Sequence, residues 1–180
     1  ERAFNRDASV TGVTTGLIDL DKNLGGLHKS DLIVLAGRPS MGKTALATNI
    51  AFNAALDILK GKRNGGGAFF SLEMSSEQLA TRILAEEAGI SSEKIRKGEI
   101  RKDDFPKFID ISRKLSEMPL YIDDTPALSI PSLRTRARRI KRKKGLDLIV
   151  VDYLQLMTSG NNIDNRVLEI SEITRSLKAI

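Results

Sequence analysis

The residues Leu32-Ile-Val-Leu-Ala-Gly-Arg-Pro-Ser-Met-Gly-Lys-Thr44 decide how this chain folds. Four apolar residues, Leu32 to Leu35, are typical of a short buried strand, and the pattern Gly, four residues, Gly-Lys-Thr that follows is typical of a phosphate-binding loop. Gly37 and Gly42 carry no Cβ, so the backbone can turn tightly and approach a phosphate. Strand, loop and helix come in the order that this loop requires, which argues against a chance glycine-rich turn.

Each part of the loop predicts a role in binding a nucleotide. The loop amides and the positive end of the following helix attract phosphate groups. Lys43 would place a mobile charge on the outer phosphates, and the Thr44 hydroxyl would coordinate magnesium. The predicted nucleotide-binding residues are Gly37, Arg38, Pro39, Ser40, Met41, Gly42, Lys43 and Thr44.

Two acidic residues follow apolar runs elsewhere in the chain. The run 148–151 is typical of an interior parallel strand, and Asp152 stands at its carboxyl end, where ligands bind in open α/β sheets. Asp152 is therefore the candidate Walker B aspartate, which holds magnesium. Glu73 follows the apolar run 68–72 and could orient a water for attack on a phosphate. On that short pattern alone, a surface glutamate at a helix start is the simpler interpretation.

Predicted helices and strands alternate along the rest of the chain, as in an α/β fold. A long helix is expected over 44–60 with Gly61 at its end, a strand over 120–122, and a helix after Ser75, which with Gln78 forms a capping pattern. Shorter or later helices are expected around 17–24, from Ser91, and over 163–180. A helix over 103–117 is predicted to pack in the core through Phe105, Phe108, Ile109, Ile111 and Leu115.

Composition limits the class of protein. A length of 180 residues suits one domain with a substantial core. Since no run of eighteen apolar residues occurs, no membrane segment is expected, and the absence of cysteine is compatible with a cytoplasmic location. The 29 basic and 23 acidic residues give a net charge of +6, which favours a polyanionic partner but on charge alone is equally compatible with a solvated basic surface.

The segment 131–144 holds the densest positive charge. Eight of its last eleven residues are Arg or Lys, and only Leu133, Ala137 and Ile140 mark a buried edge if it is a helix. It could be a nucleic-acid face or a solvated outer helix. The second interpretation is favoured, because no aromatic residue is interleaved for base stacking.

Three motifs together resemble the ATPase domain of the DnaB-family replicative DNA helicases. They are Gly37-Arg-Pro-Ser-Met-Gly-Lys-Thr44, Phe70-Ser-Leu-Glu-Met74 and Val151-Asp-Tyr-Leu-Gln-Leu-Met157, and the stretches 15–21 and 121–126 also resemble that family. The resemblance runs from about residue 11 to the end and implies a RecA-like P-loop fold, a mostly parallel sheet flanked by helices. Residues 1–13 lack periodicity and are expected to be a linker or tail, so the expected domain spans residues 14–180. It also implies that Lys43 and Glu73 are catalytic and that Thr44 and Asp152 bind the metal.

The same resemblance implies a function. It is that of an ATP-hydrolysing helicase that uses ATP and Mg²⁺, moves 5′ to 3′ on single-stranded DNA and unwinds duplex at the replication fork. The implied partners are DNA, further copies in a homo-hexamer, a primase and a helicase loader, in the cytoplasm and without a membrane. Two alternatives are another RecA-like ATPase, such as a recombinase or a clock-type ATPase, and a nucleotide-binding module without catalysis.

Members of that family continue beyond the position of Ile180 with a sensor strand, DNA-binding loops and an arginine finger. The resemblance therefore predicts a partial domain, incomplete at its C-terminus, with weak or no activity alone. It also predicts that the strand before Glu73 pairs with the strand ending at Asp152. The strand that separates the latter from residues 32–36 would come from sequence beyond Ile180.

Overall fold

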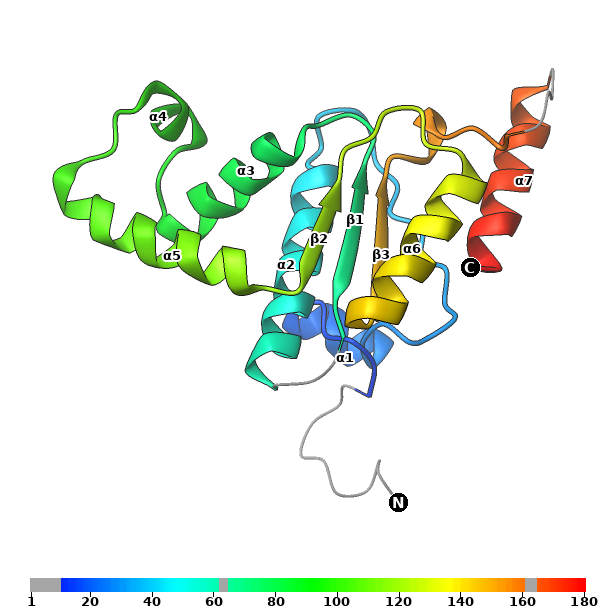
Figure 1. Ribbon diagram of the computed structural model, residues 1–180, viewed down its shortest axis with the longest axis horizontal. Coiled ribbons are helices and arrows are strands. Elements are labelled where there is room, and N and C mark those ends of the chain that lie inside the picture. The colour runs from blue at the N-terminus through cyan, green and yellow to red at the C-terminus, as the bar shows by residue number, and fades with distance from the viewer. Residues whose placement is uncertain (1–10, 62–64, 161–164) are drawn as a thin grey trace.

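The chain forms an α/β structure around a small parallel sheet (Figure 1). The computed structural model describes residues 11–61, 65–160 and 165–180. Within them, β1 (Gly67–Ser71) pairs in parallel with β2 (Leu120–Asp123) on one side and with β3 (Leu148–Asp152) on the other. Because all three strands are parallel, their carboxyl ends lie at the same edge of the sheet. The predicted pairing of the strand before Glu73 with the strand ending at Asp152 is confirmed.

Helices cover both faces of this sheet (Figure 1). On one face lie α2 (Lys43–Lys60) and α3 (Ser76–Ala88), and on the other lie α6 (Ile130–Lys144) and α7 (Arg166–Lys178). Because side chains alternate along a strand, β1 supplies both cores: Phe69 packs with Ala51 and Leu79, and Phe70 packs with Leu133 and Ile173. β1 is therefore buried along its whole length.

The remaining elements are short or lie beside the sheet. They are α1 (Ile18–Leu24), α4 (Ser92–Lys97), α5 (Phe105–Glu117) and two 3₁₀ turns, η1 (Lys102–Asp104) and η2 (Leu154–Leu156). Figure 1 shows α4 and α5 extending away from one side of the sheet. In the part of the chain that the structure describes, no helix is long and apolar enough to cross a membrane.

Most predicted helices are confirmed with ends close to those expected. The capping pattern at α3 is complete, since the Gln78 amide donates to Ser75 Oγ at 3.2 Å and the Ser75 amide donates to Gln78 Oε1 at 3.0 Å. The basic segment forms α6, with Leu133 and Ala137 buried as expected. Predictions on residues 1–10, 62–64 and 161–164, including Ile163 in the last helix, lie outside the described residues.

The predicted strand over residues 32–35 is wrong. These residues have no regular secondary structure, and all four side chains are exposed, with Val34 at 72%. A strand needs a hydrogen-bonded neighbour, and β3, the outer strand on its side of the sheet, does not pair with this segment. In the described structure, these four apolar residues therefore lie outside the sheet.

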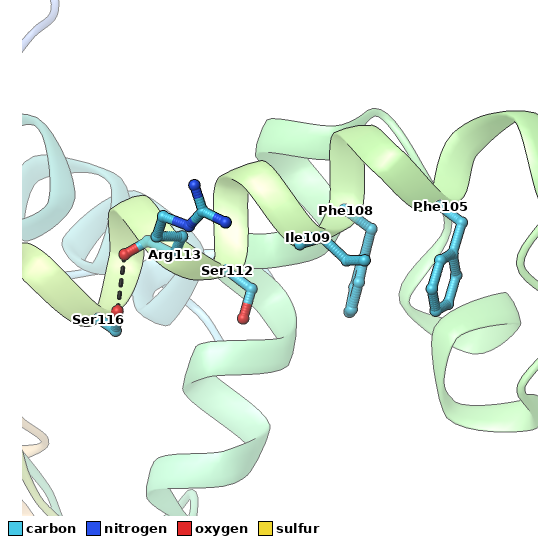
Figure 2. A pocket seen from close by; sticks show the side chains of 6 residues that line it. All are labelled: Phe105, Phe108, Ile109, Ser112, Arg113 and Ser116. Carbon is cyan, nitrogen blue, oxygen red and sulfur yellow. Dashed lines mark hydrogen bonds between the residues drawn. The ribbon is translucent and has the colours of Figure 1, made fainter.

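The core role predicted for the helix over 103–117 is also wrong in part. The helix forms as α5, but none of its residues is buried, and Phe105 and Ile109 are 53% and 46% exposed. Figure 2 shows Phe105, Phe108 and Ile109 side by side along α5, where they help to line a pocket of about 360 Å³. Because α5 packs on α3 beside the sheet, only Leu115 reaches a core cluster.

The segment before the phosphate loop is organised around a buried carboxylate and contacts α2 through Asn53. Asp21 accepts hydrogen bonds from the Thr15 amide at 2.8 Å, the Thr15 hydroxyl at 2.7 Å and the Thr14 hydroxyl at 2.5 Å. Burial opposes ionisation, but these bonds outweigh it and lower the pKa of Asp21 below its ordinary value. Asn53 of α2 donates to the Thr15 carbonyl at 3.2 Å, and it lies so close to Gly16 (φ +78°) that no Cβ would fit there.

Candidate functional site

The loop before α2 is closed by the lysine that follows it. Lys43 Nζ donates to the carbonyl oxygens of Gly37 at 3.1 Å and Arg38 at 3.4 Å. Gly42, the residue before the helix, has φ +85°, a left-handed conformation that favours glycine. The first amides of α2 have no partner within the helix, so they can donate to an anion, and Lys43 holds its positive charge beside them.

This loop lies at the edge of the sheet where the strands end (Figure 1). α2 begins at that edge and packs back along β1 and β3. The strand ends are in register, because Ser71 pairs with Asp152 and the Leu72 amide donates to the Asp152 carbonyl at 2.7 Å. Residues directly after β1 and at the end of β3 are therefore neighbours.

Asp152 is buried with an unsatisfied oxygen. The residue is 6% exposed, and its Oδ2 atom has no hydrogen-bond partner among the described residues. A buried carboxylate oxygen without a partner is unfavourable, so this atom suits a cation or a water that donates to it. Where the chain is described, no three His, Cys, Asp or Glu side chains cluster as a metal site. Magnesium there would use few protein ligands, together with phosphate oxygens and water.

Glu73 stands in the turn between β1 and α3 and is exposed to solvent. The turn is closed by Ser71, whose hydroxyl donates to the Met74 carbonyl at 2.7 Å and accepts from the Met74 amide at 3.2 Å. Its position directly after β1 places Glu73 at the same edge as Asp152 and the start of α2. The elements thus bring the predicted residues to one edge, while their roles stay predictions.

The sequence did not reveal a second set of contacts at the end of β2. Asp123 accepts two hydrogen bonds from Arg136 of α6, at 2.7 and 2.6 Å, and Asp124 accepts one from the Ser76 amide at 2.8 Å. Burial opposes ionisation of Asp123, but the bonds from Arg136 and Thr125 outweigh it and lower its pKa. The only signal in the sequence was the pair of acidic residues at the end of this strand, and such a pair does not predict which residues donate hydrogen bonds to it.

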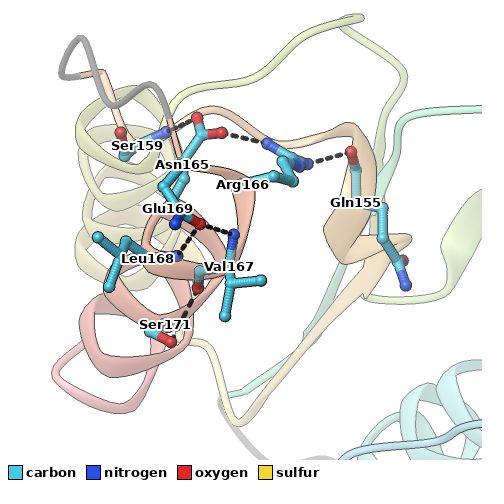
Figure 3. A network of polar contacts seen from close by, with 8 residues as sticks. All are labelled: Gln155, Ser159, Asn165, Arg166, Val167, Leu168, Glu169 and Ser171. Atoms are coloured by element: carbon cyan, nitrogen blue, oxygen red, sulfur yellow. Dashed lines mark hydrogen bonds and ion pairs between the residues drawn. The ribbon is translucent and has the colours of Figure 1, made fainter.

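A polar network joins the segment after β3 to the start of α7 (Figure 3). Arg166 pairs with Glu169 and donates to the Gln155 carbonyl, and Glu169 accepts from the Ser159 amide at 3.3 Å. The bond from Arg166 lowers the pKa of Glu169. Asn165 caps the helix by accepting from its first amides. The chain just after Asp152 is therefore tied to α7.

Sequence comparison finds relatives over nearly the whole chain. Residues 12–180 match the family model described as DnaB-like helicase C terminal domain. The chain is 53% identical over 184 residues to the replicative DNA helicase DnaB of Rickettsia bellii, covering 99% of this chain and 37% of that protein. It is 45% identical over 181 residues to the DnaB of Geobacillus stearothermophilus, covering 100% of this chain and 39% of that protein. The chain thus spans well under half the length of these relatives.

Solved structures with the same fold agree with this result. A DnaB-like replicative helicase, studied with its interactions with primase, matches with a TM-score of 0.88 and 28% identity, over 99% of this chain and 43% of that one. A second solved structure, described as an ATPase domain, matches with a TM-score of 0.89 and 28% identity, over 99% of this chain and 62% of that one.

Proposed function

This chain belongs to the family of DnaB-like helicase C-terminal domains, and we propose that it works as the ATP-hydrolysing motor domain of a replicative DNA helicase. Its α/β fold is the RecA-like one found in the ATPase domains of such helicases. One observation carries the proposal. The phosphate loop, the turn with Glu73 and the unsatisfied carboxylate of Asp152 lie at one edge of the sheet.

The proposed chemistry assigns a task to each residue. The amides of residues 37–42 and the Lys43 ammonium would bind the ATP phosphates. Thr44 and Asp152 would hold a magnesium ion, which neutralises phosphate charge when it is bound. Glu73 would orient the attacking water and accept its proton.

The wider activity belongs to the whole protein, because this chain spans 37% to 39% of the two DnaB relatives. Residues 14–180 would form the ATPase part and residues 1–13 a linker. We propose that the protein moves 5′ to 3′ on single-stranded DNA, unwinds duplex, assembles as a homo-hexamer and meets a primase and a helicase loader in the cytoplasm. What supports this is family membership.

Replacing the proposed catalytic carboxylate tests the function. In the longest natural polypeptide that contains this chain, Glu73→Gln should keep its affinity for ATP and lose about a hundredfold or more in turnover, because an amide cannot accept the water's proton. The measurements are ATPase turnover with and without single-stranded DNA, and the dissociation constant of a fluorescent ATP analogue.

Glu77→Gln is the matched control, since it makes the same change at an exposed position four residues along, in the first turn of α3. Its turnover should stay at the level of the unchanged protein. Full turnover in Glu73→Gln would contradict the role of Glu73. Nucleotide binding without hydrolysis in the unchanged protein would favour the module without catalysis.

A further inference from the structure

The turn that carries Glu73 is held in part by a hydrogen bond to the residue that follows a second strand, β2. Glu73 lies between Ser71, the last residue of β1, and Ser76, the first residue of α3. At the strand end, the Ser71 hydroxyl bonds both the amide and the carbonyl of Met74. At the helix end, Asp124 Oδ2 accepts a hydrogen bond from the Ser76 amide at 2.8 Å. The Ser75–Gln78 capping pair also holds the helix end, and Asp124 adds a carboxylate contact there from outside the turn and α3.

This carboxylate meets the amino end of α3, where its charge strengthens the contact. The first amides of a helix lack partners within the helix, and the helix dipole places partial positive charge there. A bond from such an amide to a carboxylate is charge-assisted and stronger than a neutral one. The bond from the Ser76 amide lowers the pKa of Asp124 below its ordinary value, because it favours the charged carboxylate.

Asp124 is in turn fixed by the residue beside it. Asp123 accepts two hydrogen bonds from Arg136, which also donates to the Thr125 hydroxyl at 2.6 Å. These bonds join the end of β2 to α6, so the backbone on both sides of Asp124 is held. A continuous set of contacts therefore runs from α6 through the end of β2 to the start of α3.

We propose that Asp124 is a positioning residue for Glu73. By holding the Ser76 amide, it fixes the place of the Glu73 carboxylate at the edge of the sheet. This inference rests on the proposed catalytic role of Glu73. Asp124 affects turnover and not nucleotide binding, because its hydrogen bond is with Ser76, where the turn meets α3, and not with the phosphate loop. A displacement of about 1 Å in a reacting group can lower a rate by roughly a hundredfold.

The contact can be removed from either side. Asp124→Ala removes the acceptor, and Ser76→Pro removes the donor. Proline is favoured at the first position of a helix, and Ser75 before it already has the extended conformation that proline requires, with φ −70° and ψ 157°. Each variant should fold, as measured by circular dichroism and thermal melting. Should Asp124→Ala fail to fold, Ser76→Pro tests the same bond.

Turnover and binding are measured separately in the longest natural polypeptide that contains this chain. We expect each variant to lower kcat for ATP by about tenfold or more, with the Kd of a fluorescent ATP analogue unchanged within about twofold. Asp124→Asn keeps an acceptor oxygen and should retain most of the turnover. Ser91→Ala is the matched control, because it removes a side-chain cap from the amino end of α4, and its kcat should not change.

A double variant shows whether Asp124 acts through Glu73. In a Glu73→Gln background, Asp124→Ala should change the residual turnover by less than about twofold. The inference is overturned if Asp124→Ala and Ser76→Pro both keep full kcat. It is overturned as well if they lower kcat in the Glu73→Gln background by the same factor as in the unchanged protein, or if they weaken nucleotide binding by the same factor as they lower kcat. Full turnover in Glu73→Gln alone would instead overturn the proposed function, so the two failures are distinguishable.

Discussion

Lys43 is the residue whose charge most directly serves the proposed nucleotide site. Its ammonium already bonds two loop carbonyls, of Gly37 and Arg38, so it both closes the loop and presents positive charge. Lys43→Ala should weaken ATP binding by about tenfold to a hundredfold, because a charge-assisted bond to phosphate contributes roughly 1.5–3 kcal/mol. Titration with a fluorescent ATP analogue measures this change.

Lys60→Ala is the control for that measurement. Lys60 is the last residue of the same helix and is exposed, so it lies at the opposite edge of the sheet from the loop. Its removal should leave the dissociation constant unchanged. If Lys43→Ala binds the analogue as tightly as the unchanged protein, the loop is not the nucleotide site.

Single residues could be predicted where a local pattern surrounds them. Lys43 lies in a motif of eight residues, and Asp152 ends an apolar run, so both could be chosen from the sequence. The contact between Asp124 and the Ser76 amide joins positions 48 residues apart and uses a backbone donor, which leaves no pattern in the sequence. The unsatisfied oxygen of Asp152 likewise depends on what surrounds it after folding.

At the scale of elements, the predictions succeeded where a residue pattern and its packing partner coincide. β1 is apolar on both faces and is covered by helices on both faces. The predictions failed where the pattern was right but the partner was missing. Among the described residues, no strand is hydrogen-bonded to residues 32–35, and α5 carries an apolar stripe but lies beside the sheet. A short segment of sequence shows which secondary structure it favours, but it does not show whether a neighbouring element will be there to pack against it.

The charge of α6 sets this helix apart from the rest of the molecule. Eight of the 29 basic residues lie on it and no acidic one does, so the remaining chain holds 21 basic against 23 acidic residues. Arg136 is paired with Asp123, but Arg138, Arg139 and Arg142 are exposed. The basic end of α6 lies at the edge of the sheet opposite the proposed nucleotide site (Figure 1).

We expect α6 to be a solvated outer helix and not a DNA contact. Reversing the charge of Arg138, Arg139 and Arg142 to Glu should leave the affinity for a single-stranded oligonucleotide nearly unchanged. Fluorescence anisotropy over a range of salt concentrations tests this, because each lost phosphate contact lowers the slope of log affinity against log salt by roughly 0.7. Arg175→Glu on α7, another exposed arginine near a helix end, serves as the control. A drop of about two in the slope for the triple variant alone would make α6 a DNA-binding surface.

At the scale of the whole molecule, the outer side of β3 is open to pairing with a further strand. In the described structure β3 pairs only with β1, so its outer backbone groups have no sheet partner. Residues 32–35 add four exposed apolar side chains close in sequence to the proposed site. Together these features are an aggregation hazard, since an open strand and an exposed apolar segment both favour association with another chain.

The isolated chain of 180 residues should therefore be marginally stable or should self-associate through this region. Ile33→Lys and Val34→Lys change side chains that are 54% and 72% exposed, so each should reduce self-association without loss of the fold. Light scattering after size exclusion and thermal melting measure the two effects. Ile18→Lys is the matched control, because Ile18 is 73% exposed but lies on a helix, and its change should leave self-association as it was.

The same two substitutions should act in the opposite direction where a further strand covers this region. In a longer natural polypeptide, Ile33→Lys or Val34→Lys would place a charge against buried neighbours, and the melting temperature should fall, because an unpaired buried charge is costly. Ile18→Lys should stay neutral there too. A wild-type chain of 180 residues that stays monomeric and melts cooperatively, with both lysine variants indistinguishable from it, would contradict the idea of an open edge. A lower melting temperature of the lysine variants confined to the longer polypeptide would instead show that residues 32–35 are covered there.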